Sequence, residues 1–226
     1  LPVIFTTTSL KIRKKAKGSL MNNFIKDWQK NKKILEKNHV YTELDEHSSC
    51  GVGLIASLDG SYKREIVEMG VQALKVLYHR GAVDADGKTG DGAGIQLSIP
   101  QEFFREKIER TGNKPNDLPF GVGMIFLPRT DFVAQEKSRT IVESEILKEG
   151  LKIYGWRHVP INSSIIGDKA KATRPEIEQI LIGNDKIQDE KKFDSLLYII
   201  RRRIEKEIRK NNISNFYICS LSCKSV

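Results

Sequence analysis

The chain has 226 residues, which is enough for one large domain or two small ones. With 39% hydrophobic and 30% charged residues, and no apolar run near the ~20 residues of a membrane span, it is expected to be globular rather than membrane-embedded. The net charge of +9 does not indicate a nucleic-acid surface, because residues 50–170 hold 16 basic and 16 acidic side chains and the excess lies in the flanks.

The first 49 residues give no sign of a packed core. Residues 1–20 contain five Lys or Arg and no acidic residue, a composition typical of an organelle transit peptide. We favour the alternative that the protein starts at Met21 and that residues 1–20 are not part of it. Residues 22–46 are polar and lysine-rich, with Trp28 and Leu35 as candidate helix anchors.

At Cys50 the sequence changes from polar and lysine-rich to apolar. The apolar run at 51–58 ends at the turn dipeptide Asp59-Gly60 and predicts a buried strand. Residues 65–80 have apolar side chains at helical spacing, which predicts a helix. Residues 80–94 contain five glycines and predict a loop, because each glycine costs backbone entropy in a regular element. AGIQLSI at 93–99 predicts another strand.

The remaining sequence alternates between strand and helix patterns. Strands are predicted at 121–128, 151–162 and 215–226, helices at 131–149 and 193–210, and a short helix or turn opening at Thr173-Arg174-Pro175-Glu176. Because the order is mixed without regular βαβ units, the fold class is expected to be α+β with layered sheets.

The three cysteines stand at 50, 219 and 223. An odd number with one wide gap is not a disulfide framework and fits a reducing cytoplasm. Cys219 and Cys223 have C-x3-C spacing without a second ligand pair, so strand residues are a better interpretation than a zinc site. We therefore expect no metal site.

The glycine loop lacks the pattern of a nucleotide site. GDGAG is not G-x-G-x-x-G, GKTG lacks the upstream glycine of a P-loop, and the loop precedes a predicted strand rather than a helix. Asp84, Asp86 and Asp91 could bind a divalent cation, but their spacing is not that of an EF-hand and favours turn formation.

Cys50 could be a buried structural thiol or a nucleophile. A catalytic pair needs an imidazole beside the thiol, and none of His39, His47, His79 and His158 has an evident Asp or Asn partner by spacing. If the chain were cut between Ser49 and Cys50, the new α-amino group, with a pKa of about 7.7–8.0, could take the thiol proton without any histidine.

Three motifs together resemble the class II glutamine amidotransferases: C-G-V-G-L-I-A at 50–56, H-R-G-A at 79–82 and D-A-D-G-K-T-G-D-G-A-G at 84–94. The long form of the glycine loop, IPQEFF at 99–104 and GWRHVPIN at 155–162 resemble the glutamate synthase family within that class. The resemblance runs from about Met21 to Val226.

The resemblance implies an N-terminal nucleophile hydrolase fold, a four-layer αββα sandwich. Residues 1–49 would be a leader and 50–226 the amidotransferase domain, with Cys50 as the nucleophile that hydrolyses the amide of L-glutamine. The residues that match elements near the nucleophile, and would shape the site or bind substrate, are Gly51, Arg80, Gly81, Asp91 and Gly92.

The resemblance also implies partners outside this segment. Ammonia would pass to downstream synthase domains of the same chain, where FMN and an iron–sulfur cluster serve the reductive amination of 2-oxoglutarate. No cofactor is expected within these 226 residues. A small electron-transfer subunit could be a further partner, and the location would be cytoplasmic, or plastidic if residues 1–20 are a transit peptide.

The sequence departs from the family in one respect. The R-F-S-T-N-T-like segment that holds the glutamine carboxylate and the N-G-E-like segment of the oxyanion hole do not occur up to Val226. Since loss of one oxyanion donor costs ~10²–10³ in rate, residues 1–226 alone are expected to show no useful glutaminase activity. The alternatives are another N-terminal-nucleophile amidohydrolase or a catalytically silent module of the same fold.

Overall fold

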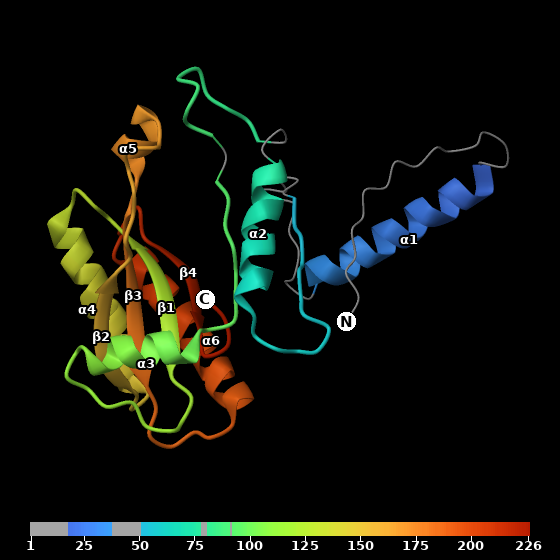
Figure 1. Cartoon of the computed structure of the whole chain (residues 1–226). Coiled ribbons are helices and arrows are strands. Elements are labelled where there is room, and N and C mark those ends of the chain that lie inside the picture. Colours follow the sequence, from blue (N-terminus) through green and yellow to red (C-terminus); the bar gives the residue numbers. More distant parts are fainter. Residues whose placement is uncertain (1–17, 38–50, 78–80, 91) are drawn as a thin grey trace. The chain divides into compact units, whose positions relative to one another are not determined.

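The computed structural model describes residues 18–37, 51–77, 81–90 and 92–226 (Figure 1). The backbone divides into two units, residues 1–73 and 74–226, which are described separately. This division concerns packing, and the leader boundary after Ser49 stays a prediction. No helix in the described ranges is long and apolar enough to cross a membrane.

The first unit contains helix α1 (Gly18–Lys37) and most of helix α2 (Arg64–Val76). The prediction of a helix at 65–80 is confirmed as far as Val76. The prediction of a buried strand at 51–58 is wrong: the segment forms no strand, and Val52 and Leu58 are 92% and 89% exposed. Backbone groups of a strand need a partner strand, and none of the described strands pairs with this segment.

The predicted turn at Asp59-Gly60 is confirmed. The amide of Gly60, at φ +71°, donates to the carbonyl of Ser57 at 3.2 Å. The Asp59 carboxylate accepts from the Lys63 ammonium at 2.7 Å and from the Ser61 hydroxyl at 2.6 Å. These bonds, the one from Lys63 first, hold the pKa of Asp59 well below its ordinary range.

The second unit is built on a four-stranded antiparallel sheet. Its strand order is β2-β3-β1-β4, and the strands are β1 (Gly121–Leu127), β2 (Lys152–His158), β3 (Glu176–Gly183) and β4 (Tyr217–Ser222). The three strands predicted at 121–128, 151–162 and 215–226 are therefore confirmed. The sequence interpretation missed β3, which pairs with both β2 and β1 in the middle of the sheet.

The prediction that a helix or turn opens at Thr173-Arg174-Pro175-Glu176 is wrong. A short helix, α5 (Asp168–Thr173), ends there, and β3 begins directly after Pro175. Arg174 has an extended backbone, with φ −58° and ψ 138°. Proline disfavours the helical region for the residue before it, so the Arg174-Pro175 pair ends α5 and starts the extended chain of β3.

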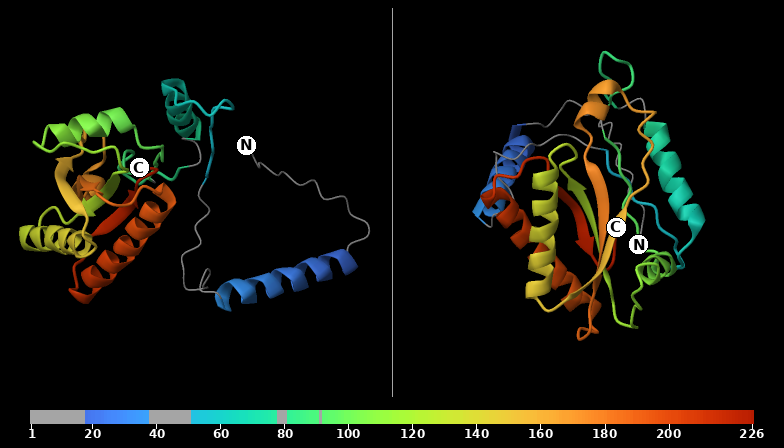
Figure 2. Two further views of the ribbon diagram at one scale, coloured as in Figure 1. Left: turned by 90° about the horizontal axis from the view of Figure 1, so that it is seen from below. Right: turned by 90° about the vertical axis from the view of Figure 1, so that its left-hand side faces the viewer.

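Helices cover the two faces of the sheet unequally. Helices α4 (Phe132–Lys148) and α6 (Glu190–Lys210) pack on one face, and α3 (Gln101–Glu109) lies against the other (Figure 2, left). Strand alternation separates the two cores, because Ile125 and Leu127 face α4 and α6 while Val122 faces α3. The larger core, on the α4 and α6 face, includes the fully buried Phe193 and Leu197.

Local signals set the ends of the two long helices. The Asp131 carboxylate accepts from the amide of Ala134 at 2.9 Å, and the Asp189 carboxylate accepts from Lys191 and Lys192, so both act as N-caps. Gly150, at φ +69°, follows α4 as predicted. Both predicted helices, 131–149 and 193–210, are confirmed.

The predicted strand at 93–99 is confirmed only as a short pairing. Leu97 and Val226 exchange two backbone hydrogen bonds of 2.9 Å, and Ser98 forms an isolated bridge with Ser225. The pairing does not extend toward residue 93. The described architecture is therefore a mixed α/β fold around an antiparallel sheet.

Candidate functional site

The glycine loop folds back on itself between Val83 and Gly90, which form an antiparallel bridge. The amide of Asp84 donates to the carbonyl of Thr89 at 2.7 Å, and the amide of Gly87 donates to the carbonyl of Asp84 at 2.9 Å. Gly87 turns the chain at φ +66°, a conformation that glycine adopts without steric cost. The loop predicted from the five glycines thus has a defined, hydrogen-bonded form in its described residues.

The Asp86 side chain holds the tip of this loop together. One carboxylate oxygen accepts from the amides of Lys88 and Thr89 at 2.9 and 2.7 Å, and the other accepts from the Thr89 hydroxyl at 2.6 Å. These bonds, the one from the Thr89 hydroxyl first, lower the pKa of Asp86 to about 2. The turn-forming role predicted for Asp84 and Asp86 is confirmed.

The loop lies against the connection that leads into α5. The Lys169 ammonium pairs with the Asp84 carboxylate at 2.6 Å. The backbone of Gly167 is buried against Asp86 and Thr89. Arg129, just after β1, donates to the carbonyls of Lys171 and Arg174 at 3.3 Å each. Sequence reasoning missed these contacts, and a glycine before a short lysine-containing helix is a weak signal for them.

The residues predicted for the site fall into two groups. Cys50, Arg80 and Asp91 lie outside the described residues. Gly51 is exposed and belongs to the first unit. Gly81 and Gly92 are exposed and flank the Val83–Gly90 bridge, which brings the two ends of the loop together.

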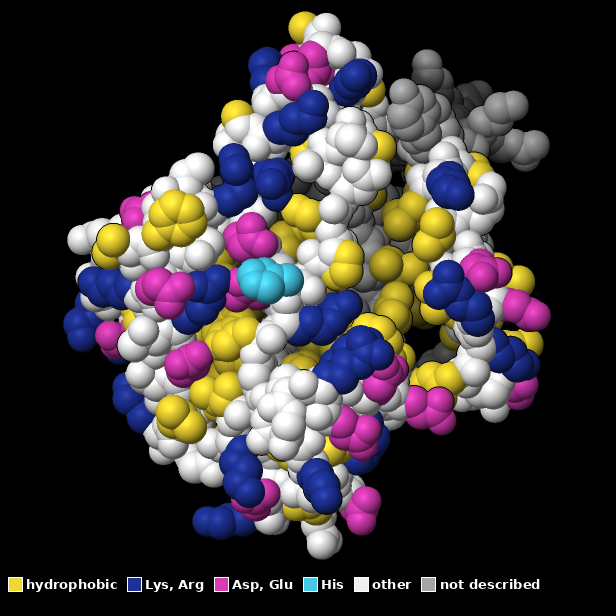
Figure 3. Space-filling view, turned by 60° about the vertical axis from the view of Figure 1, so that its left-hand side comes forward, with side chains coloured by type: hydrophobic (Ala, Val, Ile, Leu, Met, Phe, Trp, Pro, Cys, Tyr) yellow, Lys and Arg dark blue, Asp and Glu magenta, His cyan; other side chains and the backbone are white. Residues whose placement is uncertain are grey.

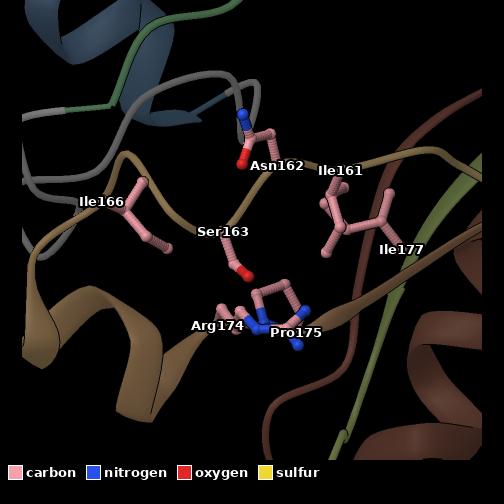
Figure 4. A pocket seen from close by; sticks show the side chains of 7 residues that line it. All are labelled: Ile161, Asn162, Ser163, Ile166, Arg174, Pro175 and Ile177. Atoms are coloured by element: carbon pink, nitrogen blue, oxygen red, sulfur yellow. The ribbon is translucent and has the colours of Figure 1, made fainter.

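A shallow pocket of about 290 Å³ lies beside α5. Its walls come from the segment after β2 and from the start of β3, and the Ser163 side chain points toward Arg174 and Pro175 (Figure 4). The lining is mostly apolar, with isoleucines at 161, 166 and 177.

A charged cluster spans the edge strand β2, its neighbour β3 and helix α4. Glu178 is 1% exposed and accepts from two nitrogens of Arg139, at 2.9 and 2.5 Å. This pairing raises the pKa of Arg139. Nδ1 of His158 lies 3.3 Å from Glu178 and 3.5 Å from Glu176. Basic and acidic side chains lie close to one another over much of the face drawn in Figure 3. The cluster ties α4 to β3 and β2, and it uses up the acceptor oxygens of the buried Glu178.

The two cysteines near the end of the chain lie in different environments. Cys219 lies in β4 and is exposed, which confirms the prediction of a strand residue, whereas Cys223 is buried in the bend after β4 and is not a strand residue. The Cys223 thiol lies 3.4 Å from the Glu190 carbonyl, and burial raises its pKa to about 12. The described residues contain no group of three metal-ligating side chains.

Comparison with known proteins defines the class. The family model for class-II glutamine amidotransferases matches residues 50–226, so the chain belongs to this family.

The similar proteins are glutamate synthases. Over 203 residues, 90% of this chain, it is 54% identical to the large chain of the NADPH glutamate synthase of Azospirillum brasilense. It is 39% identical over 184 residues to ferredoxin-dependent glutamate synthase 2 of Synechocystis, and 37% identical over 186 residues to the NADPH glutamate synthase large chain of Bacillus subtilis. The chain spans 12–13% of the length of these three relatives.

Proposed function

We propose that this chain is the glutamine amidotransferase part of a glutamate synthase. The observation that carries the proposal is the 54% identity over 90% of the chain to a glutamate synthase large chain. The family match to class-II glutamine amidotransferases over 50–226 supports the same reaction class independently. An amidohydrolase without a synthase, or a silent module, would share the family match but not such identity to synthases.

In the proposed reaction the nucleophile is the first residue of the mature chain. Removal of the leader after Ser49 frees the α-amino group of Cys50, which accepts the thiol proton. The sulfur attacks the side-chain amide carbon of glutamine, the C–N bond breaks, and ammonia leaves with the proton. Water then hydrolyses the γ-glutamyl thioester and releases glutamate. A family match that begins at Cys50 supports this cleavage position.

The remaining site residues are assigned by their motifs. Gly51 would allow close backbone approach beside the thiol, Arg80 and Gly81 form the H-R-G element, and Asp91 and Gly92 continue the glycine loop. Support for the loop assignment comes from its hydrogen-bonded form up to Gly90.

We also propose the four-layer sandwich for the complete domain. The half-buried Met124 and Phe126 alternate with Ile125 and Leu127 and so lie on the face away from α4 and α6. Phe126 contacts Tyr217, which is 56% exposed. A second sheet over this face would bury that apolar surface, which favours the sandwich arrangement.

The ammonia released would serve downstream synthase domains of the same chain. FMN and an iron–sulfur cluster would belong to those domains, and a small electron-transfer subunit and a cytoplasmic location are part of the same proposal. An iron–sulfur cluster is held by several cysteine thiolates, whereas the described residues of this segment hold two cysteines, the exposed Cys219 and the buried Cys223 beside the Glu190 carbonyl, and so do not fit one.

The test begins with the full-length polypeptide that carries this chain. Intact mass should reveal loss of everything up to Ser49, and a diazoketone analogue of glutamine should label Cys50 alone. Cys50→Ala should lower glutamine hydrolysis by about 10⁴-fold or more, whereas the control Cys219→Ala, an exposed thiol on β4, should keep it. A protein that hydrolyses glutamine while retaining residues 22–49 would contradict the mechanism.

A second measurement separates the synthase from its alternatives. With 2-oxoglutarate and a reductant, nitrogen from amide-labelled glutamine should enter the α-amino group of newly formed glutamate. Hydrolysis without this transfer would favour a free-standing amidohydrolase. Absence of both hydrolysis and Cys50 labelling would favour a silent module.

A further inference from the structure

We infer that the connection between β2 and β3 positions the glycine loop for catalysis, with Gly167 as a positioning residue. The inference rests on the proposed function, because the loop leads directly into Asp91 and Gly92, which that proposal assigns to the site by their motif. The contact itself is independent of the function and joins distant segments, since Lys169 and Asp84 are 85 residues apart in the chain.

Gly167 leaves no room for a side chain. A Cβ at this position would lie 2.8 Å from the amide nitrogen of Thr89, and closer still to the carboxylate of Asp86 and the hydroxyl of Thr89. The Asp86 carboxylate and the Thr89 hydroxyl cannot simply move aside, because the hydroxyl donates a 2.6 Å hydrogen bond to the carboxylate. This hydrogen bond closes the tip of the loop. Any larger residue must therefore push the loop away or break its internal hydrogen bonds.

Lys169, two residues after Gly167, adds a directional contact. Its ammonium meets the Asp84 carboxylate at 2.6 Å, and the Asp84 side chain is 35% exposed. The same Asp84 residue also bonds Thr89 and Gly87 through its backbone. The ion pair thus connects α5 to the base of the loop, while Gly167 contacts its tip.

The connection is itself fixed to the sheet. Arg129 follows β1 and is half-buried, and its guanidinium reaches the carbonyls of Lys171 and Arg174 at 3.3 Å. These carbonyls belong to the last part of α5 and the residue after it. A continuous set of contacts therefore runs from β1 through Arg129 and α5 to the glycine loop. A scaffold of this kind positions a catalytic loop with the precision that rate acceleration needs.

The experiment uses the full-length polypeptide with three variants: Gly167→Ala, Lys169→Ala and Lys171→Ala. Gly167→Ala should lower kcat for glutamine hydrolysis by about 10–100-fold, since a 1 Å misplacement can cost ~10²-fold. Lys169→Ala should give a smaller loss of about 2–5-fold, as expected for an exposed ion pair. Lys171 is the matched control, because it lies on the same helix and pairs with Asp168 instead of the loop.

Two readouts distinguish positioning from a folding defect. Hydrogen exchange of residues 84–90 should rise in Gly167→Ala while exchange of the sheet amides and removal of the leader stay as in the wild type. The double variant Asp84→Lys with Lys169→Asp should recover most of the activity that Asp84→Lys alone loses. If Gly167→Ala does not fold, Lys169→Glu and this charge exchange test the same contact.

The outcomes are distinct. Unchanged kcat together with unchanged exchange in the 84–90 loop of Gly167→Ala would overturn the inference. Faster exchange with unchanged kcat would show that the contact holds the loop without positioning the site, and would also overturn it. A wild-type protein without glutamine hydrolysis would defeat the proposed function instead, and the exchange data would still report the contact.

Discussion

The sheet core and the glycine loop of the second unit are held by different forces. On the α4 and α6 face, apolar side chains such as Phe193 and Leu197 are fully buried. The loop, in contrast, consists mostly of exposed residues joined by hydrogen bonds and one ion pair, with the buried Gly167 as its close support. Substitutions in the first region should therefore change global stability, and substitutions in the second should change local order and rate.

The largest stability effect is expected from Phe193→Ala. Phe193 is 0% exposed in the core between α6 and the sheet, and its truncation should cost about 3–5 kcal/mol of unfolding free energy through lost transfer and a cavity. Chemical denaturation of the second unit measures the loss. The control is Tyr198→Ala on the same helix, where the side chain is 60% exposed and the cost should stay below about 1 kcal/mol.

Arg139→Ala should have the next largest effect, a loss of about 2–3 kcal/mol of unfolding free energy. The change leaves the buried Glu178 carboxylate without its main partner, which is the costly way to break a buried ion pair. Glu136→Ala removes the exposed partner of the same arginine and should cost less than about 1 kcal/mol; an equal loss in both variants would contradict the assignment.

Asp189→Ala tests a helix end at the edge of the core. Loss of the two amide bonds that its carboxylate accepts should cost about 1 kcal/mol, measured by thermal unfolding. Asp189→Asn keeps a capping oxygen and should restore nearly all of that stability. If the asparagine variant is as unstable as the alanine variant, charge at the helix N-terminus matters more than the cap.

The smallest effect on global stability is expected at Asp86, because it belongs to the exposed glycine loop, where we expect a purely local response. The folded-state pKa of Asp86 is lowered from 3.8 to about 2, so its contribution is complete above pH 4 and is lost as the pH falls toward 2. Amide exchange of Lys88 and Thr89, corrected for intrinsic rates, should rise over this window before the sheet amides respond. In Asp86→Asn this acid step should be absent, and a step that persists would assign it to another group.

Elements with a strong local pattern could be predicted from the sequence. The 193–210 stripe and the Asp131 and Gly150 ends gave α6 and α4. The strand β3 was missed because its first four residues, Glu176 to Gln179, include only one apolar side chain. In addition, Pro175 was interpreted as the start of a helix. The last four residues of β3, Ile180 to Gly183, form the apolar run of a strand buried on both faces, but periodicity alone does not distinguish such a run from a helix.

The error at 51–58 has a different origin. The run GVGLIASL has the composition of a strand. A strand forms only where another strand offers its backbone groups, and the sequence of the run does not show whether such a partner is present. The site shows the same limit. Motifs predicted the loop and Cys50 as parts of the site, whereas the contact of Gly167 with Thr89 depends on tertiary structure and could not be found from spacing.

The irregular register between β1 and β4 determines which positions of β4 tolerate polar substitutions. The pairing shifts between Met124 and Ile125, and Ile218 and Leu221, three residues apart, both face the core beside α6. A saturation library of β4 should therefore reject polar residues at 218 and 221 and accept them at the exposed position 219, instead of following the every-second-residue rule of a regular strand.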